Sequence, residues 1–164
     1  MQALTWPLLL LIFTSKIITI PVTILALAGL VLGASPLLSI LPVASIATVI
    51  YYLTMLSTAR FEPQGSERLY SRIRIIWGVI TAVSWTMSVC VIIVAIVLRT
   101  RGVFPKYETH VGIWLMVTCA ILALVECVLS WAVAILVRKE RKRITYAAKW
   151  RPSVMDHSWS LARR

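Results

Sequence analysis

The sequence is poor in charged residues, poorer still in acidic ones, and contains no asparagine. Charged residues make up 14% of its 164 residues and hydrophobic residues 60%, whereas a soluble domain is about 25% charged and about 45–50% apolar. This composition excludes soluble globular, disordered and collagen-like proteins and indicates an integral membrane protein. The lack of asparagine excludes N-glycosylation. The three cysteines, an odd number without paired spacing, predict neither a disulfide framework nor a zinc site.

Long apolar stretches determine the predicted fold. A helix needs roughly 20 apolar residues to cross about 30 Å of hydrocarbon. Between Leu8 and Thr58 the one charged residue is Lys16, and this stretch is long enough for two helices, which we expect to separate at Gly33–Pro36. The sequence therefore predicts an all-α integral membrane protein, a four-transmembrane-helix bundle with spans at about residues 8–32, 37–58, 75–98 and 111–137.

The distribution of basic residues predicts the orientation. Of the 17 lysines and arginines, only Arg99, Arg101 and Lys106 fall on the face opposite to the two termini. Because cytoplasmic loops carry the excess of basic residues, we expect both termini in the cytoplasm. No basic residue precedes the first apolar stretch, so we expect an uncleaved anchor there rather than a cleaved signal peptide. We expect a multi-pass protein of the plasma membrane or of an endomembrane, and the sequence does not distinguish between them.

Glu126 is the acidic residue within a predicted span, and Lys16 lies at a similar depth in another. Charged groups at membrane depth are costly and suggest a function. One interpretation of Glu126 is structural, a neutral carboxyl that ties helices together through Ser or Thr. The other is proton or cation handling. Lys16 either pairs with Glu126 or extends to the cytoplasmic headgroups.

Small and polar residues within the spans predict helix packing. Ala26, Gly29 and Gly33 lie three and four residues apart, which favours close helix approach. Tryptophans toward the span ends are typical of the membrane interface; they are Trp77, Trp114 and Trp131. Hydroxyl side chains that we expect to bond across helices are Ser84, Thr86, Ser88, Thr118 and Ser130.

The residues after the fourth span form a basic cytoplasmic tail, 138–164, in which we expect Pro152 to end any helix. Its first residues include a polybasic run, Arg138, Lys139, Arg141, Lys142 and Arg143. Such a run directly after a span predicts binding to anionic lipid headgroups, although it can also serve only to set the topology. Because the positive charge is explained by the membrane, we expect no nucleic-acid partner.

No residue pattern indicates catalysis or a cofactor. His110 and His157 fall outside the predicted spans, which argues against a membrane-embedded haem. The sequence has no Ser/His/Asp or Cys/His constellation, glycine-rich phosphate loop or acidic metal cluster. We therefore expect no enzymatic activity, no metal and no cofactor.

The layout resembles the small four-span MARVEL-like membrane proteins of fungi over about residues 8–143. The likeness rests on the ending of the first span, residues 26–35, and on residues 126–131 before the basic exit. It implies a role in membrane organisation or trafficking. We expect a protein that organises or sorts membrane components through lateral helix contacts, as a homo- or hetero-oligomer, and through its basic tail. The alternative is a small transporter or channel subunit that uses Glu126 as a proton or cation site.

Overall fold

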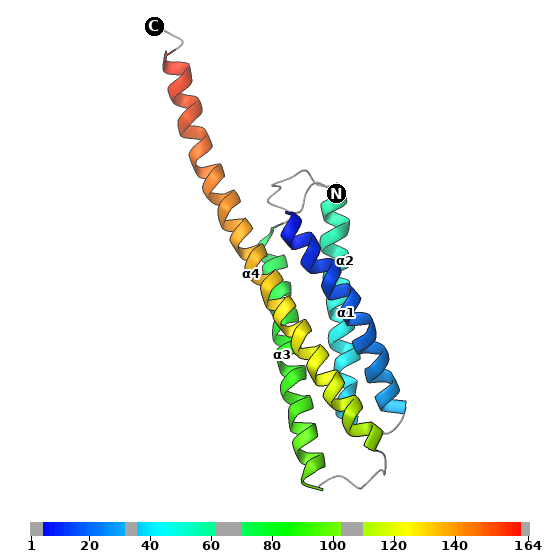
Figure 1. Ribbon diagram of the computed structural model, residues 1–164. Coiled ribbons are helices and arrows are strands. Elements are labelled where there is room, and N and C mark those ends of the chain that lie inside the picture. The colour runs from blue at the N-terminus through cyan, green and yellow to red at the C-terminus, as the bar shows by residue number, and fades with distance from the viewer. Residues whose placement is uncertain (1–4, 32–35, 62–69, 103–109, 162–164) are drawn as a thin grey trace.

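The computed structural model describes residues 5–31, 36–61, 70–102 and 110–161, and this part of the chain is almost entirely helical (Figure 1). Four long helices are present, each long and apolar enough to cross a membrane. This confirms the all-α class and the four candidate spans. The helices are α1 (Trp6–Val31), α2 (Ile40–Phe61), α3 (Arg72–Thr100) and α4 (His110–Leu161), with a short 3-10 helix η1 (Pro36–Ser39) before α2.

The fourth helix is much longer than its predicted span. It has 52 residues and continues from the bundle through Pro152 to Leu161, so the prediction that Pro152 ends any helix is wrong. A proline inside a helix removes one backbone hydrogen bond at a cost of about 3 kcal/mol, but the bonds of the flanking turns remain. The first helix likewise continues through Pro21.

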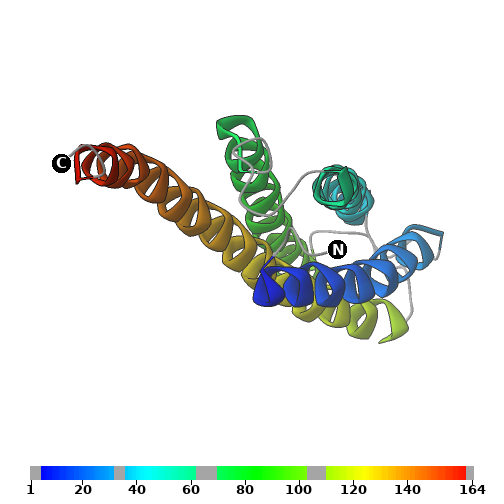
Figure 2. The same cartoon turned by 90° about the horizontal axis from the view of Figure 1, so that it is seen from above.

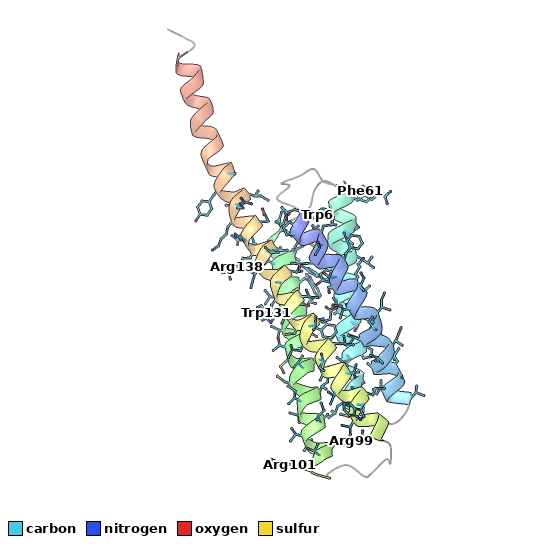
Figure 3. The ribbon with its side chains drawn as sticks, in the orientation of Figure 1. Trp6, Phe61, Arg99, Arg101, Trp131 and Arg138 are labelled. Atoms are coloured by element: carbon cyan, nitrogen blue, oxygen red, sulfur yellow. The ribbon has the colours of Figure 1, made fainter. Side chains whose placement is uncertain are left out.

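The four helices form a closed ring in which α1 and α3 each pack against both α2 and α4. Consecutive helices run in opposite directions, as in an up-down-up-down bundle (Figures 1 and 2). The start of α1, the end of α2 and the start of α3 therefore lie at one end, where α4 also leaves the bundle. Figure 3 shows Trp6 and Phe61 at this end and Arg99 and Arg101 at the opposite one.

The bundle has an apolar outer surface and a partly polar interior. Large apolar side chains such as Ile24, Ile46, Ile80 and Val128 are exposed along all four helices. Hydroxyl and carboxyl side chains are buried instead: Ser15, Thr19, Ser45, Thr48, Thr81, Ser88, Glu126 and Ser130. This is the reverse of the pattern in a water-soluble bundle, and it suits a helix bundle surrounded by lipid.

Two apolar clusters fill the rest of the interior. One cluster includes Leu8, Ile12 and Val137 at the end where α4 leaves the bundle, and the other includes Val22 and Trp85 toward the opposite end. The buried Ser15, Thr19 and Glu126 lie between these two clusters along α1 and α4. We call the buried polar residues at this level the polar layer: Ser15, Thr19, Tyr52, Glu126 and Ser130.

The predicted small residues pack against other helices of the same chain. Ala26 and Gly29 are buried in the bundle, and Ala26 packs in the apolar cluster that contains Leu38 and Leu41. Gly33 lies outside the described residues. Because Ala26 and Gly29 are covered by the chain's own helices, contacts with another protein would need the exposed faces of the spans.

Candidate functional site

Glu126 is fully buried and bonded to two hydroxyls of α1. The Ser15 hydroxyl donates to Oε2 at 2.7 Å, and the Thr19 hydroxyl lies 2.8 Å from Oε1. Ser15 and Thr19 are four residues apart, so they lie on the same face of α1. Their hydroxyls therefore hold both carboxyl oxygens and tie α1 to α4.

Other polar groups complete the layer around this carboxyl. The buried Tyr52 phenol, from α2, lies near Ser15, Ser130 and Glu126. Ser130 lies one helical turn beyond Glu126 on α4, and its buried hydroxyl has no hydrogen-bond partner of good geometry. Side chains of three helices thus meet at one level of the bundle. Among the described residues, the buried hydroxyls of Ser45 and Tyr51 likewise have no hydrogen-bond partner, and each such group costs about 1–3 kcal/mol.

Lys16 does not join the polar layer. Within the described residues, Lys16 makes no ion pair, and the partners of Glu126 are Ser15 and Thr19. Of the two alternatives for Lys16, the pairing with Glu126 is therefore not formed. The physical reason is helical geometry, because adjacent residues point about 100° apart, and the face that carries Ser15 and Thr19 is the one turned to α4. Lys16 is half-buried beside it, and its extension to the headgroups stays a prediction.

Two Trp–Thr hydrogen bonds connect other pairs of helices. Trp85 Nε1 donates to Thr48 Oγ1 at 2.8 Å between α3 and α2, and Trp131 Nε1 donates to Thr86 Oγ1 at 3.2 Å between α4 and α3. The sequence analysis missed Ser15, Thr19, Tyr52 and the Trp85–Thr48 pair. The available signal for the first two was their spacing of four residues on one apolar helix.

The hydroxyls expected to bond across helices have mixed outcomes. Thr86 does so, with Trp131 and with the Cys127 sulfur at 3.3 Å. Ser88 and Thr118 instead donate to carbonyls of their own helices. Of the tryptophans expected at the membrane interface, Trp77, Trp114 and Trp131 are all exposed on the bundle surface.

The polybasic run lies on the extension of α4 and is divided between two faces. Arg138, Lys139, Lys142 and Arg143 are exposed and share one side of the helix with the exposed Tyr146. We call these five residues the basic face. Arg141 is half-buried, and Arg143 also forms an ion pair with Glu140 at 3.3 Å.

The opposite side of the extension packs against the bundle. Ile144 is partly buried against an apolar cluster that contains the buried Tyr70, from the segment just before α3. Burial raises the pKa of the Tyr70 phenol, and the nearby Glu140 carboxylate raises it further. This contact fixes the start of the extension, so the basic face is presented in one orientation while the rest of α4 projects away from the bundle (Figure 2).

Comparison with protein-family models, with curated proteins and with solved structures finds no match. The resemblance to MARVEL-like proteins therefore stays a prediction.

Proposed function

We propose that the chain is a four-span membrane protein with both termini in the cytoplasm, and that it organises or sorts membrane components without enzymatic activity. In this proposal the basic face binds anionic lipid headgroups, and the exposed apolar faces of the spans make lateral contacts with other membrane proteins or with further copies of the chain. The MARVEL-like resemblance implies the same kind of role.

The observation that carries the proposal is the position of the basic face on a helix that continues directly from a span. Residues 138–143 rise about 9 Å along the helix at 1.5 Å per residue, which is comparable to the Debye length of about 8 Å at physiological ionic strength. These side chains therefore lie within electrostatic reach of the surface from which α4 emerges. Anionic lipids attract such residues by about 1 kcal/mol each.

The organiser role is also supported by how the bundle uses its polar groups. Glu126 has both carboxyl oxygens bonded within the chain, as expected for a residue that ties helices together. Ala26 and Gly29 are likewise buried by packing inside the bundle. The surfaces left for partners are the lipid-facing apolar sides and the basic face.

The test is vesicle binding by the full chain held in nanodiscs of neutral phosphatidylcholine. Removing two charges of the basic face, Lys139→Gln with Arg143→Gln, should weaken binding to phosphatidylserine vesicles by about 2 kcal/mol, roughly 30-fold. The matched control, Arg101→Gln with Lys106→Gln, removes two charges that the sequence places on the opposite side and should leave binding unchanged. Equal binding by wild type and both variants at low salt would leave the basic run as a topology determinant and contradict the proposal.

A further inference from the structure

The Thr19 hydroxyl makes two short contacts with other oxygen atoms, but it has one hydrogen to donate. Thr19 Oγ1 lies 2.8 Å from the Ser15 carbonyl oxygen and 2.8 Å from Glu126 Oε1. Both distances are those of ordinary O–H···O hydrogen bonds, and each bond is strongest when it has a hydrogen of its own. A hydroxyl has a single hydrogen, although its oxygen can also accept. A shared hydrogen gives one short and one longer contact at Thr14, whose Oγ1 lies 2.7 Å from the Leu10 carbonyl oxygen and 3.1 Å from that of Leu11. The two equally short contacts of Thr19 instead fit a second hydrogen on Glu126.

Two other threonines of this chain show how the single hydrogen is used. Thr48 donates to the Ala44 carbonyl at 2.8 Å and accepts the Trp85 indole N–H. Thr86 donates to the Ala82 carbonyl at 2.9 Å and accepts the Trp131 indole N–H. In both, the hydroxyl gives its hydrogen to the carbonyl four residues earlier and accepts from a donor on another helix.

Thr19 has the same arrangement, with a carboxyl oxygen in the place of the indole nitrogen. We infer that Glu126 is a proton-binding site, whose carboxyl group carries a hydrogen on Oε1 and donates it to Thr19. Thr19 in turn donates to the Ser15 carbonyl, and the Ser15 hydroxyl donates to Glu126 Oε2. Every polar atom of this chain of bonds then has a partner.

The surroundings favour the neutral acid over an ionised carboxylate. Glu126 is fully buried, and within the described residues no basic side chain forms an ion pair with it. An unpaired buried charge is strongly unfavourable. The titratable side chain that interacts with the carboxyl there is the Tyr52 phenol of α2, which is uncharged at neutral pH.

The Ser130 hydroxyl is a further buried polar group near this carboxyl. It is buried, lies one turn from Glu126 on the same helix, and meets the same Tyr52 phenol. A hydroxyl without a partner can both accept and donate. This inference is independent of lipid binding by the basic face.

Infrared spectroscopy of the full chain tests the inference, in a detergent without carbonyl groups such as dodecyl maltoside. At pH 7 the wild type should show a C=O stretch of a protonated carboxylic acid, and Glu126→Gln should lose it. The matched control is Glu140→Gln, on the same helix but outside the polar layer, which should keep the band. A wild-type minus Glu126→Gln difference spectrum with only carboxylate bands would overturn the inference.

A second pair of variants keeps the test valid if Glu126→Gln fails to fold. Thr19→Val removes the acceptor of the acid hydrogen, and Thr19→Ser retains it. The acid band should shift in Thr19→Val and keep its position in Thr19→Ser. A band that is unmoved in both variants would show that the Glu126 carboxyl does not donate to Thr19, and the inference would be wrong.

Discussion

The contact between Gly78 and Tyr51 allows a sharp test of how α2 and α3 pack. A methyl group built at Gly78 would lie 2.8 Å from the Tyr51 hydroxyl oxygen and 3.2 Å from Cζ. The first distance is too short for a carbon and an oxygen that are not bonded, so the phenol must move. Tyr51 is 5% exposed and its hydroxyl has no hydrogen-bond partner among the described residues. The hydroxyl therefore occupies space next to Gly78 without gaining a bond.

Opposing effects set the expected magnitudes. Gly78→Ala gains about 1 kcal/mol from helix propensity and loses about 1–3 kcal/mol from overpacking, so a net destabilisation of about 0–2 kcal/mol is expected. Tyr51→Phe removes a buried polar group without a partner and should be neutral or stabilising by about 1 kcal/mol. In the Tyr51→Phe background the clash with the oxygen is gone and the 3.2 Å contact with Cζ remains, so Gly78→Ala should then cost less than in wild type or stabilise by up to about 1 kcal/mol.

The measurement is a double-mutant cycle on the free energy of unfolding, followed by circular dichroism as the bundle is unfolded in sodium dodecyl sulfate. We expect a coupling energy of about 1–3 kcal/mol between Gly78→Ala and Tyr51→Phe. Tyr52→Phe is the control, because Tyr52 is adjacent in sequence but absent from the close contacts of Gly78; its coupling to Gly78→Ala should stay within about 0.5 kcal/mol. Equal effects of Gly78→Ala in the Tyr51 and Tyr51→Phe backgrounds would refute the packing argument.

Three further perturbations have definite expected outcomes. Thr48→Val leaves the fully buried Trp85 indole N–H without its acceptor and should lower the free energy of unfolding by about 1–3 kcal/mol, whereas Thr48→Ser should restore most of it; equal losses would contradict the role of the hydroxyl. Lys16→Gln should change unfolding by less than about 0.5 kcal/mol, and a larger loss would indicate an ion pair in the membrane. Because the pKa of Tyr70 is raised from its usual 10.0, its neutral form stabilises the fold fully below pH 10 and less as the pH rises through the higher folded value. Thermal melts above pH 10 should therefore destabilise wild type more than Tyr70→Phe, and parallel losses would show that this phenol does not titrate in the folded protein.

The number and approximate limits of the helices could be predicted because bilayer thickness fixes the length of an apolar helix. The first predicted span, 8–32, differs from α1 by two residues at its start. The extension of α4 could not be predicted in the same way. Past Arg138 the sequence loses its hydrophobic periodicity, and the helix continues there in part because Ile144 packs near Tyr70, a contact between residues distant in sequence.

The identity of the residue that bonds to Glu126 could not be predicted from the sequence. Depth along a helix follows from 1.5 Å per residue, which places Lys16 near the level of Glu126, whereas the carboxyl bonds to Ser15 and Thr19. The choice between Ser15 and Lys16 depends on the rotation of α1 about its axis. That rotation is set by packing against α2 and α4 together, and a single apolar helix carries almost no periodic signal for it when lipid and protein interior are equally apolar.

Because lipid and the protein interior are equally apolar, polar contacts are needed at selected points inside this bundle. An apolar side chain gains little free energy by packing against another helix instead of lipid. Apolar contacts therefore specify the order of the helices around the ring only weakly. Hydrogen bonds do specify it: Trp85 with Thr48 joins α3 to α2, Trp131 with Thr86 joins α4 to α3, and Glu126 joins α4 to α1. Three of the neighbouring pairs in the ring are consecutive along the chain, so the Glu126 contact is the one that joins helices, α4 and α1, which the connectivity does not bring together. Each polar contact thus identifies one neighbour that the apolar surfaces would not distinguish.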